Sequence, residues 1–198
     1  MKIAKVQAFV DGGHLRSIAT AWDQCLISPY SFCSSLNKRF SDRALTRCTY
    51  YDSLDENPSD VDYDMDGYLN AIAAFHNTHV GFGSLRGSKR RQQKGVDVLL
   101  SVQMLVGAVH KNFDFAILVA GDGDFVPAVE EVQRFGVNVY LLSSEKVNKK
   151  ISDDLLRAVD GFYTIENLLG GAHRLNSVCE LESNGCRWKQ VGKVIKRT

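Results

Sequence analysis

Two aspartates separated by a single glycine, Asp122 and Asp124, follow the apolar run of residues 115–119 and precede a helical pattern. A third aspartate, Asp11, ends another apolar run, residues 3–10, and is followed by two glycines. If both runs are strands of an open α/β sheet, the three carboxylates lie at its carboxyl edge, where such folds usually bind ligands. We therefore expect these acids to converge on one site.

Several carboxylates at one edge of a sheet repel one another unless a cation neutralises them. Mg²⁺ and Mn²⁺ prefer oxygen ligands, so the pattern predicts a divalent metal site. The alternative for each residue is helix capping, because Asp is a favoured N-cap. A helix needs only one N-cap, so capping explains only one of Asp122 and Asp124. The other carboxylate is free for a different role, such as binding a metal.

A fourth acid, Asp97, lies in the first turn of a helical pattern over residues 96–109. This segment carries apolar residues on several faces, which predicts a buried helix rather than a surface one. An acid at its start could join the metal site. The alternative is simple pairing with the helix dipole, which favours an anion in the first turn.

Five cations and no acid occupy the stretch just upstream of Asp97, namely Arg86, Lys89, Arg90, Arg91 and Lys94. Cations beside a metal site suit a polyanionic substrate, because they hold backbone phosphates while the metal holds the reacting one. The alternative is an ordinary solvated loop, since surface charge is common. The position of the run next to Asp97 favours a phosphate contact.

The 198 residues and 44% hydrophobic content are typical of one domain with a sizeable core. With 24 Lys plus Arg against 23 Asp plus Glu, the overall charge says nothing about a polyanionic partner. The five cysteines are odd in number and form no Cys-x-x-Cys pair, which argues against zinc ribbons and a disulfide framework. We expect a cytoplasmic protein without a signal peptide or membrane span.

Strand-like runs alternate with helical patterns along the chain, which predicts βαβ units and a mostly parallel sheet. The expected strands are residues 3–10, 45–51, 80–83, 115–119, 137–142 and 162–165. The helices expected between them include residues 30–40, 65–75 and 96–109.

Three ordered motifs resemble those of NYN domains, and most closely the LabA-like branch. They are Phe9-Val-Asp11-Gly-Gly-His14-Leu15, Lys94-Gly-Val-Asp97-Val and Leu118-Val-Ala-Gly-Asp122-Gly-Asp124-Phe125, within a resemblance over about residues 3–166. The resemblance implies a three-layer α/β/α PIN-like fold with a central, mostly parallel sheet. It also implies a ribonuclease that hydrolyses phosphodiester bonds of RNA, preferably single-stranded, with Mg²⁺ or Mn²⁺ held by the catalytic residues Asp11, Asp97, Asp122 and Asp124.

Two positions depart from the family pattern: His14 stands where Asn is frequent, and Gln103 where Asp is frequent. Gln103 removes one negative charge, and it lies about 120° around the helix from Asp97, so the two need not share a metal. His14 could contact a phosphate, order a ligand or pack. With Asp52 these residues are candidate accessory groups. The competing interpretation is a catalytically weak or inactive module that binds RNA or protein.

We expect the NYN-like domain to occupy residues 1–170 and a basic C-terminal extension to occupy residues 171–198. The cations of the extension include Arg187, Lys189 and Lys193. An accessory contact to RNA or to a partner subunit of a homo-oligomer is one interpretation. A frayed terminus is the other, since terminal residues are frequently poorly ordered.

Overall fold

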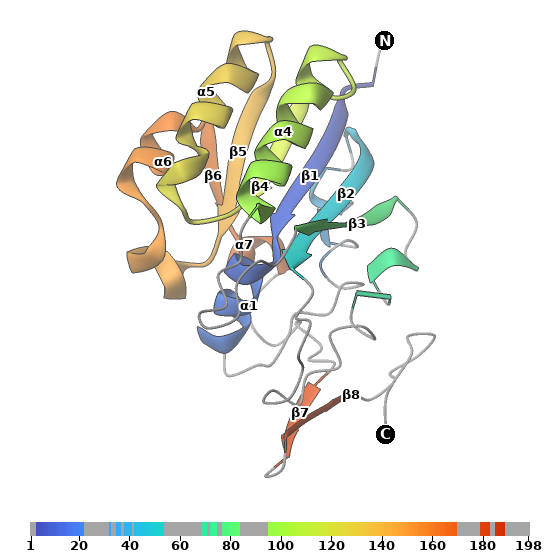
Figure 1. Cartoon of the computed structure of the whole chain (residues 1–198), viewed down its shortest axis with the longest axis vertical. Helices are drawn as coiled ribbons and strands as arrows, with labels where there is room; N and C mark the ends of the chain where they lie inside the picture. The colour runs from blue at the N-terminus through green and yellow to red at the C-terminus, as the bar shows by residue number, and fades with distance from the viewer. Residues whose placement is uncertain are drawn as a thin grey trace.

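The computed structural model describes residues 3–21, 32, 35–36, 38–40, 42–53, 69–70, 72–74, 77–83 and 95–169, with the backbone of 179–182 and 185–188. Its centre is a six-stranded sheet in which every pair of neighbouring strands is parallel (Figure 1). The strands lie in the order β3-β2-β1-β4-β5-β6. Their bounds are β1 Lys5–Asp11, β2 Ala44–Ser53, β3 Thr78–Gly83, β4 Phe115–Val119, β5 Asn138–Ser143 and β6 Gly161–Thr164.

Helices cover both faces of this sheet, and the alternating side chains of the strands divide the core in two. On one face, Val6, Ala8 and Val10 of β1 pack with α1 (Gly12–Ala21). On the other face, Phe9 packs in the cluster that also contains α4 (Val96–Val109), α5 (Val126–Arg134) and α6 (Asp153–Ala158). The chain therefore has the three-layer α/β/α architecture of the PIN-like fold.

Short elements complete the described part of the chain. The 3₁₀ turns η1 (Gly123–Phe125) and η2 (Glu145–Lys150) follow β4 and β5, and α7 (Ile165–Leu169) follows β6. A separate antiparallel hairpin, β7 (Cys179–Glu182) and β8 (Gly185–Trp188), lies within the predicted extension of residues 171–198. No helix among the described residues is long and apolar enough to cross a membrane.

All six predicted strands are present, with bounds that differ by a few residues at most. The helix predicted over residues 96–109 is confirmed as α4. The helices predicted at 30–40 and 65–75 lie largely outside the described residues, but their described parts include helical residues at 32, 35–36, 38–39, 69–70 and 72–73. We did not predict α6, α7 or the hairpin, because these elements are too short to show a clear period.

The prediction that residues 96–109 form a buried helix rather than a surface one is wrong. Four valines on its outer side are exposed, with exposed fractions of 65% at Val98, 50% at Val102, 48% at Val106 and 48% at Val109. Only one side of α4 meets the sheet, and the buried residues there include Leu100 and Met104. An apolar composition reports that a helix prefers burial, but a single sheet can cover only the side that faces it.

Gly107 in α4 is required by its neighbour Phe113. A Cβ added at Gly107 would lie 2.5 Å from the Phe113 ring, which is itself buried. In an open helix, Gly→Ala stabilises by about 1 kcal/mol. Here we expect Gly107→Ala to destabilise the protein by about 1–2 kcal/mol, because the ring must shift in a packed core.

Urea unfolding of the wild type, Gly107→Ala and Gly107→Ala/Phe113→Leu measures this effect. The double variant should recover part of the loss, since the shorter Leu side chain relieves the collision. A Gly107→Ala variant more stable than the wild type would contradict the packing described for this helix.

Candidate active site

Asp11 is the last residue of β1, and the start of α1 holds its carboxylate in place. The Gly13 N–H donates to Asp11 Oδ1 at 2.8 Å, so Asp11 does cap the helix. The pKa of Asp11 is raised from 3.8 to about 6, chiefly by burial and to a smaller extent by the negative charge of Asp97. The backbone N–H groups of His14 and Gly13 and the charge of Arg16 oppose this rise. The balance leaves a mostly buried carboxyl that is costly to ionise.

Asp97 lies in the first turn of α4, which begins next to the end of β3. A Cβ added at Gly83 of β3 would lie 2.6 Å from Val96 Cγ2, so the bare glycine allows this close approach. The pKa of Asp97 is raised by burial first, and then by the negative charges of Asp122 and Asp124. If Asp97 only complemented the helix dipole, its charged form would be favoured. Burial and the two neighbouring acids act in the opposite direction, because they disfavour the charged form of Asp97.

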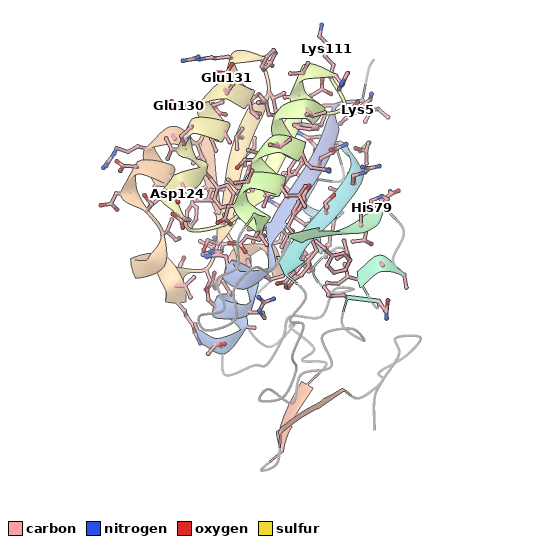
Figure 2. The ribbon with its side chains drawn as sticks, in the orientation of Figure 1. Lys5, His79, Lys111, Asp124, Glu130 and Glu131 are labelled. Carbon is pink, nitrogen blue, oxygen red and sulfur yellow. The ribbon has the colours of Figure 1, made fainter. Side chains whose placement is uncertain are left out.

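Asp122 and Asp124 follow β4 and are both exposed. Asp122 caps η1, because its Oδ1 accepts from the Asp124 N–H at 3.1 Å. The turn is held from the other side as well, where Ser152 N–H donates to the Gly121 carbonyl at 2.8 Å. A cap uses one carboxylate oxygen of Asp122, so its other oxygen and the Asp124 carboxylate (Figure 2) are available to a ligand.

Electrostatic effects connect the four predicted acids. The charge of Asp97 raises the pKa of Asp11, and the charges of Asp122 and Asp124 raise the pKa of Asp97. They come from the end of β1, the start of α4 and the turn after β4, which is the neighbour of β1 in the sheet. Within the described ranges, no three Asp, Glu, His or Cys side chains are gathered closely enough to hold a metal ion. The four acids therefore influence one another electrostatically, but the described residues do not form a complete set of metal ligands.

The accessory candidates lie in different surroundings. His14 is buried, and its Nε2 is 2.8 Å from Oγ of the buried Ser143 at the end of β5. Of the three roles considered for His14, this contact supports packing, with an added hydrogen bond that ties α1 to β5. The sequence offered no signal for Ser143, because the two residues are 129 positions apart.

Asp52 is occupied by a different partner. Its side chain is 1% exposed and forms a two-pronged ion pair with Arg16 of α1, whose Nη1 also donates to the Tyr50 hydroxyl at 3.2 Å. A Cβ added at Gly12 would lie 2.5 Å from Asp52 Oδ2, so α1 packs directly on this pair. The pair links α1 to β2 and serves the fold. Sequence reasoning missed Arg16 altogether.

Gln103 is exposed on α4. It lies six residues beyond Asp97, which is about 9 Å along the helix axis. Gln103 thus lies more than one helical turn from Asp97 on the same helix. The five predicted RNA contacts lie outside the described residues: Arg86, Lys89, Arg90, Arg91 and Lys94.

Comparison with known proteins identifies the family. The family model of the NYN domain matches residues 5–166, which contain all four acids and the whole six-stranded sheet. No curated protein and no solved structure matches the chain. The family model covers most of the chain and agrees with its architecture. The chain therefore belongs to the NYN domain family, a family of PIN-like and generally nuclease-like proteins.

Proposed function

We propose that this protein is a metal-dependent ribonuclease of the LabA-like branch, with Asp11, Asp97, Asp122 and Asp124 as its catalytic acids. The observation that carries the proposal is the mutual charge effect among these residues at the carboxyl edge of the sheet. Acids that only cap helices need not lie within electrostatic reach of one another. Acids that bind one cation together must lie within electrostatic reach of one another.

The chemistry of the donor set fits Mg²⁺ or Mn²⁺. Every candidate ligand is a carboxylate oxygen, which hard divalent cations prefer. The pKa values of Asp11 and Asp97 are raised by burial first and by neighbouring acids second, so the ionised carboxylates are unfavourable without a counter-charge. A bound cation supplies that compensation and favours the ionised carboxylates. Because no three candidate ligands among the described residues are gathered closely, binding would draw the carboxylates together.

A bound divalent ion would lower the pKa of a water and stabilise negative charge on the phosphoryl oxygens. The protein's own residues hold the carboxylates in place. Gly13 and His14 aim their backbone N–H groups at Asp11, which orients its carboxylate at the end of β1. Asp122 and Asp124 are exposed and can meet a phosphate that arrives from solvent. No covalent intermediate is required.

We propose single-stranded RNA as the substrate. RNA is a polyanion, and the cations of residues 86–94 precede Asp97 directly in the chain. Such a run would hold the phosphates on either side of the reacting one. The support for RNA over DNA comes from the family resemblance.

The test is metal removal from the wild-type protein. We expect cleavage of an end-labelled single-stranded RNA to stop in EDTA and to return with excess Mn²⁺ or Mg²⁺. A DNA oligonucleotide of the same sequence serves as the matched substrate and should be cleaved more slowly. Cleavage that continues in EDTA would contradict a metal-dependent reaction.

A second candidate is a module that binds RNA or protein without cleaving it. The observation that favours this role is the lack of a closed set of metal ligands among the described residues. The same experiment separates the two. RNA that is retained in a gel shift but stays intact with every metal would favour the binding module over the nuclease.

A further inference from the structure

Ser152 lies against the turn that carries Asp122 and Asp124. Its backbone N–H donates to the Gly121 carbonyl at 2.8 Å. Its hydroxyl lies beside Gly123, because a Cβ added at Gly123 would be 2.8 Å from Ser152 Oγ. Gly123 is the residue between the two acids, and α6 packs against η1. The Ser152 hydroxyl therefore lies at the turn between two of the proposed catalytic acids.

The helix that follows Ser152 does not use this hydroxyl. Ser152 is the N-cap of α6, a position where serine usually accepts a hydrogen bond from a backbone N–H of the first turn. Its side chain forms no such cap hydrogen bond. Ser152 is also partly exposed, unlike the buried Ile151 before it. The hydroxyl is thus open to a ligand that binds at the turn.

Gly123 makes room for this hydroxyl. Among the described glycines only Gly95 and Gly136 have a positive φ, so backbone conformation does not require the glycine at position 123. What Gly123 provides is space, because a side chain at this position would meet Ser152. The bare glycine lets a hydroxyl approach the turn between the acids.

A phosphate at this turn needs hydrogen-bond donors as well as a metal. Ionised carboxylates only accept hydrogen bonds, so Asp122 and Asp124 cannot donate to phosphate oxygens. A serine hydroxyl can donate, and serine side chains are frequent phosphate contacts in protein–DNA complexes. We propose that the Ser152 hydroxyl donates a hydrogen bond to a phosphate oxygen of the RNA that meets the acids at this turn. The proposal rests on the proposed function, and it adds a neutral donor that forms no covalent bond.

Three variants test the role of the hydroxyl: Ser152→Ala, Ser152→Thr and Ser152→Val. Threonine keeps the hydroxyl, whereas valine is branched in the same way without it, so any strain from the added methyl group is common to both. In Ser152→Ala, the dissociation constant for a single-stranded RNA should rise about tenfold or more, because a hydrogen bond to a charged group is lost. Ser152→Val should bind about tenfold more weakly than Ser152→Thr for the same reason.

Fluorescence anisotropy of an end-labelled RNA, with Ca²⁺ in place of Mn²⁺, measures binding, and a gel checks that the RNA stays intact. Initial cleavage rates with excess Mn²⁺ give a second readout, in which kcat/KM should fall in the Ala and Val variants only. The urea midpoint of Ser152→Ala should stay near that of the wild type, since the hydroxyl makes no cap hydrogen bond. The matched control is Thr20→Ala, which removes an exposed hydroxyl near the end of α1 and should bind RNA like the wild type.

Equal dissociation constants for Ser152→Thr and Ser152→Val would overturn the proposal, because a side chain that only packs on Gly123 needs no hydroxyl. So would a Ser152→Ala variant that binds RNA as tightly as the wild type. A wild type that binds RNA but cleaves it with no metal would contradict the proposed nuclease alone, since the binding comparison still decides the role of Ser152. A wild type that neither binds nor cleaves RNA would contradict both.

Discussion

Asp122→Asn is expected to slow metal-dependent RNA cleavage by about a thousandfold, which corresponds to roughly 4 kcal/mol of transition-state stabilisation. The substitution removes one negative charge from the proposed ligand set. It leaves the local structure intact, because the Asn Oδ1 can still accept from the Asp124 N–H. The unfolding free energy should therefore change by less than about 0.5 kcal/mol.

Initial cleavage rates of a labelled single-stranded RNA with excess Mn²⁺ measure this effect. Asp154→Asn is the matched control, because Asp154 is an exposed acid on α6 that pairs with Arg157 and takes no part in the proposed site. The control should cleave like the wild type. If Asp122 were only a helix cap, Asn would replace it without loss. Equal rates for Asp122→Asn and the wild type would thus defeat the catalytic assignment.

Asp11→Asn is expected to stabilise the metal-free protein at pH 8 by about 2 kcal/mol. The pKa of Asp11 is about 6 in the folded protein and 3.8 for an ordinary Asp. The folded protein thus binds this proton more tightly than the unfolded chain. The stability that Asp11 contributes is full below about pH 4 and is lost as the pH rises through about 6. Asparagine has no such charge to bury and keeps the acceptor for the Gly13 N–H.

Saturating Mn²⁺ should reverse this order. The cation would stabilise the wild type by binding its ionised carboxylates, whereas the Asn variant has lost one ligand and should gain less. Urea unfolding at pH 5 and pH 8, in EDTA and in Mn²⁺, measures both effects. Asp154→Asn again controls for the loss of one exposed carboxylate. A wild type that gains nothing from Mn²⁺, or an Asp11→Asn variant that is less stable at pH 8 in EDTA, would contradict the proposed site.

The local pattern of the chain determined the strands, the α4 helix and the places of the four acids. A buried strand reads as a short apolar run, and an acid directly after such a run must lie at the carboxyl edge of a parallel sheet. For this reason Asp11 and Asp122 could be assigned to one edge before the strand order was known. The same logic placed Asp97 in the first turn of α4, because that helix has a clear beginning after Gly95.

Only the tertiary structure decided which side of α4 is covered and which partners the polar residues have. An apolar helix pattern indicates a preference for burial but not how many surfaces are available to cover the helix, so the exposure of the four valines of α4 could not be predicted. Likewise, Asp52 meets Arg16 and His14 meets Ser143 only because β2 and β5 are brought beside α1. The raised pKa of Asp11 depends on burial and on Asp97, and both arise when distant segments pack together. Periodicity is a property of neighbouring residues, whereas burial, ion pairing and pKa depend on what the folded chain places across space.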